Sequence, residues 1–250
     1  TEQQKLTASD GASNDLFGYS VSISGDTVIV SDSGSAYVFV RSGTSWTQQQ
    51  KLTASDAASF GNSVSISGDT AIVGDFYDHD NGPYSGSAYV FVRSGTSWTQ
   101  QQKLTASDGS PTAKFGYSVS ISGDTAIVGA GGHDRLGSAQ LSNSGSAYVF
   151  VRSGTTWTEQ QKLTASDAAV DYWFGISVSI YGDSAIVGAY GDADKGTNAG
   201  SAYVFVRSGT TWTEQQKLTA SDGASEDSFG NVVSISGDSA IVGAQYSDDS

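Results

Sequence analysis

The stretch Gly-Ser-Ala-Tyr-Val-Phe-Val-Arg, at Gly86–Arg93, occurs four times in this chain of 250 residues. The other copies begin at Gly34, Gly145 and Gly200. Apolar residues fill successive positions of the stretch, so a strand formed by it has two apolar faces, and both must be covered. Similar sheets packed face to face would cover both.

Other motifs recur in the same order around this stretch. Lys-Leu-Thr-Ala-Ser-Asp occurs five times, and a Trp follows each copy of the apolar stretch. Phe-Gly opens five segments, at Phe17, Phe60, Phe115, Phe174 and Phe229. Successive Phe-Gly pairs lie between 43 and 59 residues apart. A repeat of this length is typical of the blades of a β-propeller.

Each unit is expected to form four short antiparallel strands, which we name A to D from the centre outward. In the second unit these are Ser63–Ser67, Thr70–Gly74, Ser87–Val92 and Trp98–Leu104. Strand A alternates Ser with Val or Ile, the pattern of a strand. Its Ser-Gly-Asp turn suits the backbone angles of a tight hairpin. Strand D is polar and rich in Gln, as a solvated outer edge requires.

The sequence therefore predicts an all-β fold: one β-propeller domain, residues 1–250, of four-stranded antiparallel blades. The expected parts are complete blades at 17–56, 60–108, 115–167 and 174–222, and a fifth blade without strand C at 229–250. Residues 1–10 repeat the strand D motif, and we expect them to be the outer strand of a closing or a neighbouring blade. Three arrangements remain open: ring closure, strand donation that builds an oligomer or filament, and a fragment of a longer array.

These motifs resemble the FG-GAP repeat, the blade of the integrin alpha-subunit propeller and of many bacterial surface proteins. The resemblance covers the whole chain. It rests on Phe-Gly, on Gly-Ser-Ala-Tyr-Val-Phe, and on Ile-Val-Gly-Ala at Ile127–Ala130, Ile186–Ala189 and Ile241–Ala244. It implies an extracellular or cell-surface protein that acts in binding or adhesion.

The chain departs from the family pattern in two ways. The Pro of Gly-Ala-Pro is absent, and a tight Ser-Gly-Asp turn replaces the calcium loop that the family places between strands A and B. The family's best-known metal sites therefore do not carry over.

The composition disfavours several classes of function. The net charge of −14 disfavours binding to nucleic acid, whose phosphates require a basic surface. No apolar stretch approaches the ~18 residues of a membrane span. Without Cys there is no thiol nucleophile. There is also no Gly-x-Ser-x-Gly motif, and near-equivalent blades give no single privileged carboxylate pair. We therefore do not expect an enzyme.

The copies differ mainly in two sets of loops, those between strands B and C and those between strand D and the next strand A. Propeller geometry places both sets on one face, which we call the variable face. Variation on a constant scaffold is typical of a binding surface. Most acidic residues lie in these loops, so the variable face is expected to be strongly negative and to favour cations or basic partners. The alternative is that these acids only keep the protein soluble.

Aromatic residues of the variable loops are the candidate ligand-binding residues. They are Tyr77, Tyr84, Tyr172, Trp173 and Tyr190. Aromatic rings beside acidic and amide groups suit a glycan or a peptide ligand. The repeated Trp at the start of strand D is expected to cover the blade periphery, with a sugar-stacking platform as the alternative. The constant Arg at the end of strand C is expected to pair with a carboxylate or carbonyl of its own blade.

Acidic residues of two loops are the candidate metal ligands. They are Asp75, Asp78, Asp80, Asp192 and Asp194. Closely spaced carboxylates followed by Gly suit calcium, which takes six to eight oxygen ligands. Neither loop matches the EF-hand pattern, and a solvated loop is the alternative. Calcium is the one cofactor that the sequence suggests.

Three functions remain open from the sequence. The first is an extracellular or cell-surface binding or adhesion propeller with a protein or glycan ligand on its acidic variable face. The second is a structural protein that self-assembles through its terminal strands. The third is a lectin-like propeller that binds carbohydrate.

Overall fold

The structure is a computed structural model, and it describes residues 2–54, 56–57, 59–132 and 143–247. These residues form strands joined by turns and loops. Within the same ranges there is no helix of the length and apolarity that crossing a membrane requires. Four four-stranded antiparallel sheets and one two-stranded sheet account for all the strands. The expected all-β fold of five repeats, the last one incomplete, is confirmed.

The strands follow the chain in the order A to D within each blade. Blade 1 contains β1 (Val21–Ser24), β2 (Thr27–Ser31), β3 (Ala36–Ser42) and β4 (Ser45–Leu52). Blade 2 contains β5 (Ser63–Ser67), β6 (Thr70–Asp75), β7 (Ser87–Ser94) and β8 (Ser97–Leu104). Blade 3 contains β9 (Ser118–Ser122), β10 (Thr125–Ala130), β11 (Ser146–Ser153) and β12 (Thr156–Leu163). Blade 4 contains β13 (Ser177–Tyr181), β14 (Ser184–Ala189), β15 (Ser201–Ser208) and β16 (Thr211–Leu218). Blade 5 contains β17 (Phe229–Ser236) and β18 (Ser239–Ala244).

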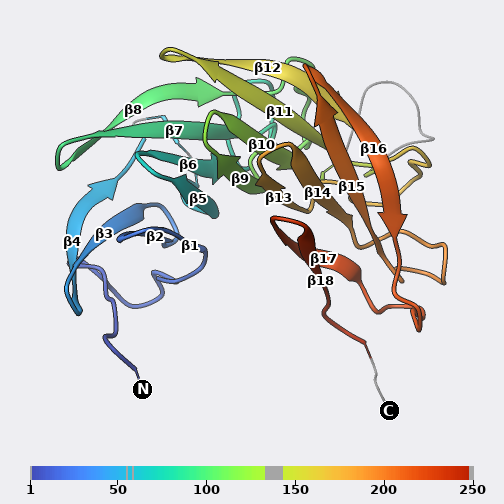
Figure 1. Ribbon diagram of the computed structural model, residues 1–250, viewed down its shortest axis with the longest axis horizontal. Helices are drawn as coiled ribbons and strands as arrows, with labels where there is room; N and C mark the ends of the chain where they lie inside the picture. Colours follow the sequence, from blue (N-terminus) through green and yellow to red (C-terminus); the bar gives the residue numbers. More distant parts are fainter. Residues whose placement is uncertain (1, 55, 58, 133–142, 248–250) are drawn as a thin grey trace.

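The blades stand side by side along an arc, as Figure 1 shows. The first strand of each blade lies on the inner side of the arc, and the fourth strand of each complete blade lies on the outer side. Blades 1 and 5 stand apart at the two ends. The arrangement is that of propeller blades around an axis, and the ring is open across the described residues.

The N-terminal segment lies against blade 1. Residues 2–10 form no strand and do not reach blade 5. Instead, the Gln4 side chain donates a hydrogen bond to the Trp46 carbonyl at 2.9 Å and accepts one from the Trp46 N–H at 2.7 Å. Gln50 of blade 1 bonds Trp98 of blade 2 in the same way. The segment therefore occupies the place of a preceding strand D against blade 1.

The apolar core lies between consecutive blades. One cluster joins Ile72 and Val90 of blade 2 to Phe115, Val128 and Phe150 of blade 3, all of them buried. Similar clusters join blades 1 and 2 and blades 3 and 4. The strand with two apolar faces is therefore covered on both sides by its neighbours, as its sequence predicted.

Serine side chains tie the inner strands together. Ser65 and Ser67 of blade 2 accept hydrogen bonds from the Ile121 and Gly123 N–H groups of blade 3, each at 3.1 Å. The other junctions repeat these bonds, with Ser20, Ser22, Ser24, Ser120, Ser122, Ser177 and Ser179 as acceptors. The alternation of Ser with Val or Ile thus has two physical causes: the serines bond the next blade, and the apolar residues fill the core.

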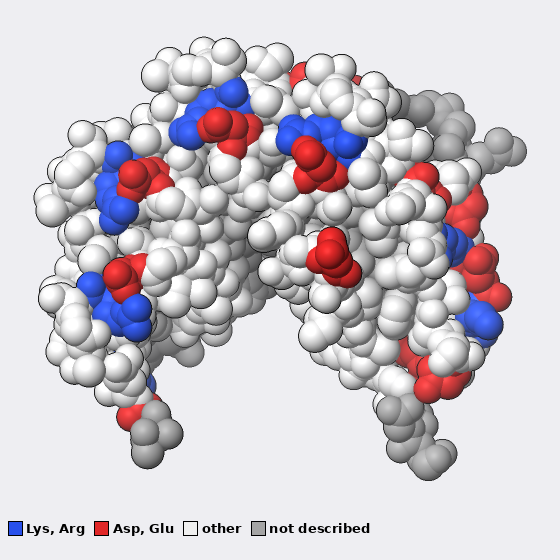
Figure 2. Space-filling model, viewed as in Figure 1, with Lys and Arg blue, Asp and Glu red and all other residues white. Residues whose placement is uncertain are grey.

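The constant Arg and Trp residues are structural. Arg93 forms an ion pair with Asp69 of its own blade and donates to the Thr27 hydroxyl of blade 1 at 3.2 Å. Equivalent pairs lie side by side along the face seen in Figure 2. The Trp98 indole donates to Gln49 of blade 1 at 3.1 Å, and Trp98 is buried. Trp157 and Trp212 are buried in the same way, so these three rings offer no platform to a sugar.

Glycine permits the closest approach between blades. Gly86, which precedes strand C of blade 2, forms a parallel bridge with Phe115 of blade 3. A Cβ atom on Gly86 would lie 2.0 Å from the Phe115 carbonyl oxygen, and one on Gly116 would lie 2.1 Å from the Ser87 carbonyl oxygen. Both glycines also have positive φ, at 82° and 85°. Only glycine avoids both the collision and the strain.

We predict that Gly116→Ala and Gly123→Ala differ sharply in their cost. Both positions have positive φ, at 85° and 57°, but a Cβ on Gly123 meets no atom within 4 Å. Gly123→Ala should lower the free energy of unfolding by about 1 kcal/mol, the cost of the left-handed backbone. Gly116→Ala should cost about 3 kcal/mol or more, because backbone must move. Urea denaturation measures both, and equal losses would contradict the packing argument.

Candidate functional site

Four of the loops that enter strand A share one backbone conformation. The residue before Phe-Gly has nearly the same positive φ in each: 55° at Leu16, 56° at Lys114, 57° at Trp173 and 58° at Ser228. A second positive φ lies two residues earlier, at Asn14, Thr112, Asp171 and Glu226. A bulky residue such as Trp rarely adopts this conformation. The loops thus keep one strained backbone and change the side chain that it displays.

Hydrogen bonds from the preceding blade hold this conformation. The Trp173 N–H donates to the Asn143 carbonyl at 2.9 Å, and the Lys114 N–H donates to the Tyr84 carbonyl at 2.9 Å. The Ser228 N–H donates to the Asn198 carbonyl at 2.9 Å. Each loop before strand A is thereby fastened to the loop before strand C of its neighbour. The variable side chains stand on a fixed frame.

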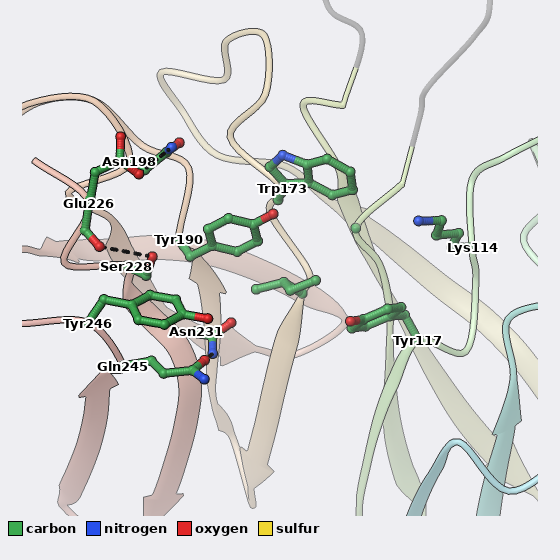
Figure 3. A pocket seen from close by; sticks show the side chains of 12 residues that line it. Lys114, Tyr117, Trp173, Tyr190, Asn198, Glu226, Ser228, Asn231, Gln245 and Tyr246 are labelled. Carbon is green, nitrogen blue, oxygen red and sulfur yellow. Dashed lines mark hydrogen bonds between the residues drawn. The ribbon is translucent and has the colours of Figure 1, made fainter. Parts of the chain in front are cut away.

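A cavity of about 580 Å³ opens on the variable face among blades 3, 4 and 5. Figure 3 shows the side chains that point into it. Its lining residues are Lys114, Tyr117, Gly131, Trp173, Ile176, Tyr190, Asn198, Glu226, Ser228, Asn231, Gln245 and Tyr246. Ligand pockets in proteins have volumes in this range, about 300–1,000 Å³.

One part of the cavity is aromatic. The rings of Trp173 and Tyr190 are nearly parallel, with their centroids 6.0 Å apart and an angle of 18° between the planes. The Lys114 ammonium group lies 5.4 Å from the centroid of Trp173. Burial raises the pKa of the Tyr190 hydroxyl, so that hydroxyl stays protonated at neutral pH and can donate a hydrogen bond.

The part of the cavity nearest blade 5 is polar. The Asn231 amide donates to the Gln245 side-chain oxygen at 2.6 Å, and the Asn198 amide donates to Glu226 at 3.1 Å. Tyr246 stands at the rim with 63% of its surface exposed. Figure 3 shows these groups facing Trp173, Tyr117 and Lys114 across the opening.

The aromatic residues predicted to bind ligand lie in three places. Trp173 and Tyr190 come together in the cavity. Tyr77 and Tyr84 pack edge to face in blade 2, with their centroids 5.4 Å apart. Tyr172 points elsewhere, with the Lys217 ammonium group 5.9 Å from its ring centroid. The sequence could not separate these groups, because all five lie in loops of the same face.

One variable position that lines the cavity was not among the residues predicted from the sequence. The residue after Phe-Gly contributes Tyr117, Ile176 and Asn231 from three successive blades. This position varies from copy to copy within a constant motif, as Tyr19, Asn62, Tyr117, Ile176 and Asn231. That variation could have identified the position as part of the variable face, even though the position borders strand A and does not lie in a long loop.

Four of the five predicted metal ligands surround lysine ammonium groups. Lys217 Nζ lies 2.6 Å from Asp167, 2.7 Å from Asp192 and 2.6 Å from Asp194. One carboxylate oxygen from each of these aspartates lies within 4.8 Å of the others. In blade 2, Lys103 forms the same contacts with Asp56, Asp78 and Asp80, at 3.0, 2.7 and 2.6 Å.

These contacts shift the pKa values of the cluster around Lys217. Burial opposes the charge of Lys217, but its hydrogen bonds to the three carboxylates outweigh burial and raise its pKa. Burial likewise opposes ionisation of Asp167, yet hydrogen bonds from Lys217 and Tyr203 lower its pKa. Burial and the nearby charge of Asp192 raise the pKa of Tyr203. The cluster is thus a fixed ion pair network at neutral pH.

The arrangement bears on the expected calcium sites. At Asp78, Asp80, Asp192 and Asp194 the ammonium group already supplies positive charge, and a calcium ion would have to displace it to gather its oxygen ligands. Asp75 lies apart and is buried, where it accepts the Ser59 and Tyr77 N–H groups at 3.1 and 3.2 Å. Calcium binding at these five residues stays a prediction.

The same lysines reduce the expected charge of the variable face. The concentration of acidic residues in the variable loops predicted a strongly negative face. In the structure, strand D lysines pair with the last Asp of Thr-Ala-Ser-Asp, as Lys51 does with Asp10 and Lys162 with Asp108. These lysines belong to strands and reach across into the loops, where they offset part of the acidic charge expected on the variable face.

Stacked antiparallel blades that display variable side chains on a fixed loop frame define a propeller-type repeat protein. The FG-GAP repeat matches the chain at residues 1–39, 46–91, 98–150, 157–205 and 212–250, and the chain belongs to this family. No curated protein matched the chain. FG-GAP repeats are typical of extracellular or surface proteins, often serve binding or adhesion, and are typically non-enzymatic.

We predict that Lys217→Gln destabilises the protein and creates a response to calcium. The change leaves three neighbouring carboxylates unpaired, with the Asp192 side chain 1% exposed, at a cost of about 3 kcal/mol. Adding calcium should raise the melting temperature of the variant and leave that of the wild type nearly unchanged. The control is Lys195→Gln, a change at an exposed residue of the loop that carries Asp192 and Asp194.

The pH dependence of the two proteins should differ in steepness. Because Lys217 lowers the pKa of Asp167, the wild type should lose stability as pH falls through the carboxyl range. The variant should lose less stability over that range, since protonation relieves repulsion among its three carboxylates, while Asp56, Asp78 and Asp108 contribute alike in both proteins. Thermal melts at several pH values measure this, and parallel curves would contradict the interpretation of the cluster.

Proposed function

We propose that this protein is an extracellular or cell-surface binding or adhesion module that holds its ligand in the cavity of the variable face. One observation carries the proposal: Trp173 is kept at a φ of 57° while its ring faces an open cavity. Leu16, Lys114 and Ser228 share this backbone conformation, so what distinguishes Trp173 is the ring that it places in the cavity. Blade 5 carries Ser at the same backbone position, so the fold does not require an aromatic residue there.

The chemistry of the cavity favours binding over catalysis. Among its lining residues Glu226 is the one carboxylate and Lys114 the one amine, and they stand on opposite sides of the opening. General acid–base or nucleophilic catalysis needs a reactive group and a partner within hydrogen-bond reach. The other lining groups are aromatic rings, amides and a hydroxyl, which recognise a ligand without transforming it.

Array binding tests the proposal. Labelled protein is applied to one array of glycans and one of overlapping peptides, beside the variant Trp173→Ser, which copies the residue of blade 5. We expect the wild type to be captured by probes of one array and the variant to lose at least about tenfold of that signal. Leu16→Ser, at the same backbone position in blade 1, should bind as the wild type does. Capture by neither array would overturn the proposal.

A second candidate function is self-assembly, and it is favoured by two exposed apolar faces. In blade 1, Val21 and Ile23 of strand A are 63% and 64% exposed, whereas the equivalent Val64 and Ile66 of blade 2 are 6% and 5% exposed. In blade 5, Ile241 is 74% exposed, although its counterparts in the other blades are fully buried. Each face corresponds to one half of the contact that joins consecutive blades. The two could therefore join copies of the chain head to tail.

Light scattering tests self-assembly. If the two faces join, the measured mass should rise above 25.8 kDa with concentration. Ile23→Lys should return it to that value, because the buried contact would acquire a charge. Tyr181→Lys, a change at an exposed residue of blade 4, should have no effect. A wild-type mass that stays constant over the whole concentration range would exclude this function.

A further inference from the structure

The cavity around Trp173 is electrically balanced within a strongly acidic protein. Lys114 and Glu226 carry opposite charges, and the other polar lining groups are neutral. The chain as a whole has a net charge of −14, which repels anionic ligands from its surface. A cationic ligand would find one carboxylate in the cavity, and that group already accepts a hydrogen bond from Asn198. The charges therefore favour a neutral ligand.

The aromatic part of the cavity offers the partly exposed rings of Trp173 and Tyr190. An aromatic ring carries partial negative charge on its faces and attracts groups with partial positive charge. The C–H bonds on one face of a pyranose ring are such groups, and together they form an apolar patch that packs against an aromatic ring. Backbone bonds already hold Trp173 in position, so little conformational freedom is lost when a ligand stacks on it.

The polar part of the cavity offers paired donors and acceptors. An amide has two donor hydrogens and an acceptor oxygen, so the bonded pair Asn231–Gln245 keeps both kinds of position for a ligand. Neighbouring sugar hydroxyls also donate and accept at adjacent atoms. Polar groups that match hydroxyls discriminate against ligands that lack them, because the groups would be left unpaired. Aromatic and amide groups together thus match a hydroxyl-rich ligand with an apolar face.

Aromatic rings continue beyond the cavity into blade 2. Tyr117 at the cavity wall lies 5.2 Å from Phe76, measured between ring centroids. Phe76 lies 4.1 Å from Tyr77, which in turn lies 5.4 Å from Tyr84. Tyr77 and Tyr84 are 41% and 43% exposed. A chain of sugar units that extends past Tyr117 would meet these rings next.

The geometry points to a neutral oligosaccharide as the ligand of this cavity. One pyranose ring stacks in the aromatic part formed by Trp173 and Tyr190, and its hydroxyls bond the Asn231–Gln245 pair. Further units run past Tyr117 toward the rings of blade 2. This assignment rests on the proposed function, of which it specifies the ligand class.

Isothermal titration calorimetry tests the ligand class. The probes are cellotriose, maltotriose, the trimer of N-acetylglucosamine, their monosaccharides, and trigalacturonate as the anionic probe. We expect at least one neutral trisaccharide to bind with a dissociation constant below about 1 mM. Its monosaccharide should bind at least about tenfold more weakly, because it cannot reach the rings of blade 2. Trigalacturonate should bind more weakly than the neutral trimers.

Matched variants distinguish ligand binding in this cavity from ligand binding elsewhere on the protein. Trp173→Ser should weaken binding of the neutral trisaccharide at least about tenfold, and Leu16→Ser should leave it unchanged. Tyr77→Ala should weaken the trimer and leave the monosaccharide as it is. Thermal melts check that each variant is folded. Binding that is equal in the wild type and in folded Trp173→Ser would overturn the assignment.

The outcomes distinguish this inference from the proposed function. If no neutral trisaccharide binds and no neutral glycan of the array captures the protein, the assignment falls. If peptides then capture the wild type but not Trp173→Ser, the cavity is a protein-binding site and the proposed function stands. If anionic sugars bind better than neutral ones, the charge argument is wrong and the assignment also falls. If neither array captures the protein, both proposals fall.

Discussion

The backbone contact between one blade and the Phe-Gly of the next governs this structure. Because glycine has no side chain, the Gly86 backbone can form a bridge with Phe115 of the next blade. For the same reason Gly116 can lie directly against the Ser87 backbone of the preceding blade. At that spacing the apolar strands cover one another, and the serines of one inner strand reach the N–H groups of the next. A side chain at these glycines would separate the blades and weaken every other contact at the junction.

The same contact shapes the variable face. Three of the loops before strand A end at such a bridge, and these loops adopt one conformation with nearly equal φ values at Lys114, Trp173 and Ser228. Side chains at the end of these loops can therefore vary while the frame stays constant. Lys114, Trp173 and Ser228 occupy one backbone position in three blades and meet at one cavity. Stability and the proposed recognition of a ligand use different atoms of the same loop, so each can change without the other.

The charged residues are likewise divided between the scaffold and the cavity. The ion pairs of the arginines and of the strand D lysines recur from blade to blade, and they link adjacent parts of the fold. Around Lys217 and Lys103 they gather carboxylates that would otherwise repel one another. The cavity lies apart from these clusters and holds one charge of each sign. Electrostatics thus stabilises the scaffold and leaves the proposed site to aromatic and amide groups.

The sequence by itself determined the strands, their order and the number of blades, because each depends on local patterns that recur five times: Phe-Gly, alternating Ser and Val, and the turn glycines. It also placed Trp173 and Tyr190 on the variable face. Only the tertiary structure decided that these two meet, that Tyr172 turns to Lys217, and that lysines occupy the acidic clusters. Those outcomes depend on how each loop is fastened to its neighbouring blade. Distances between residues of different blades cannot be inferred from the pattern of residues within one repeat.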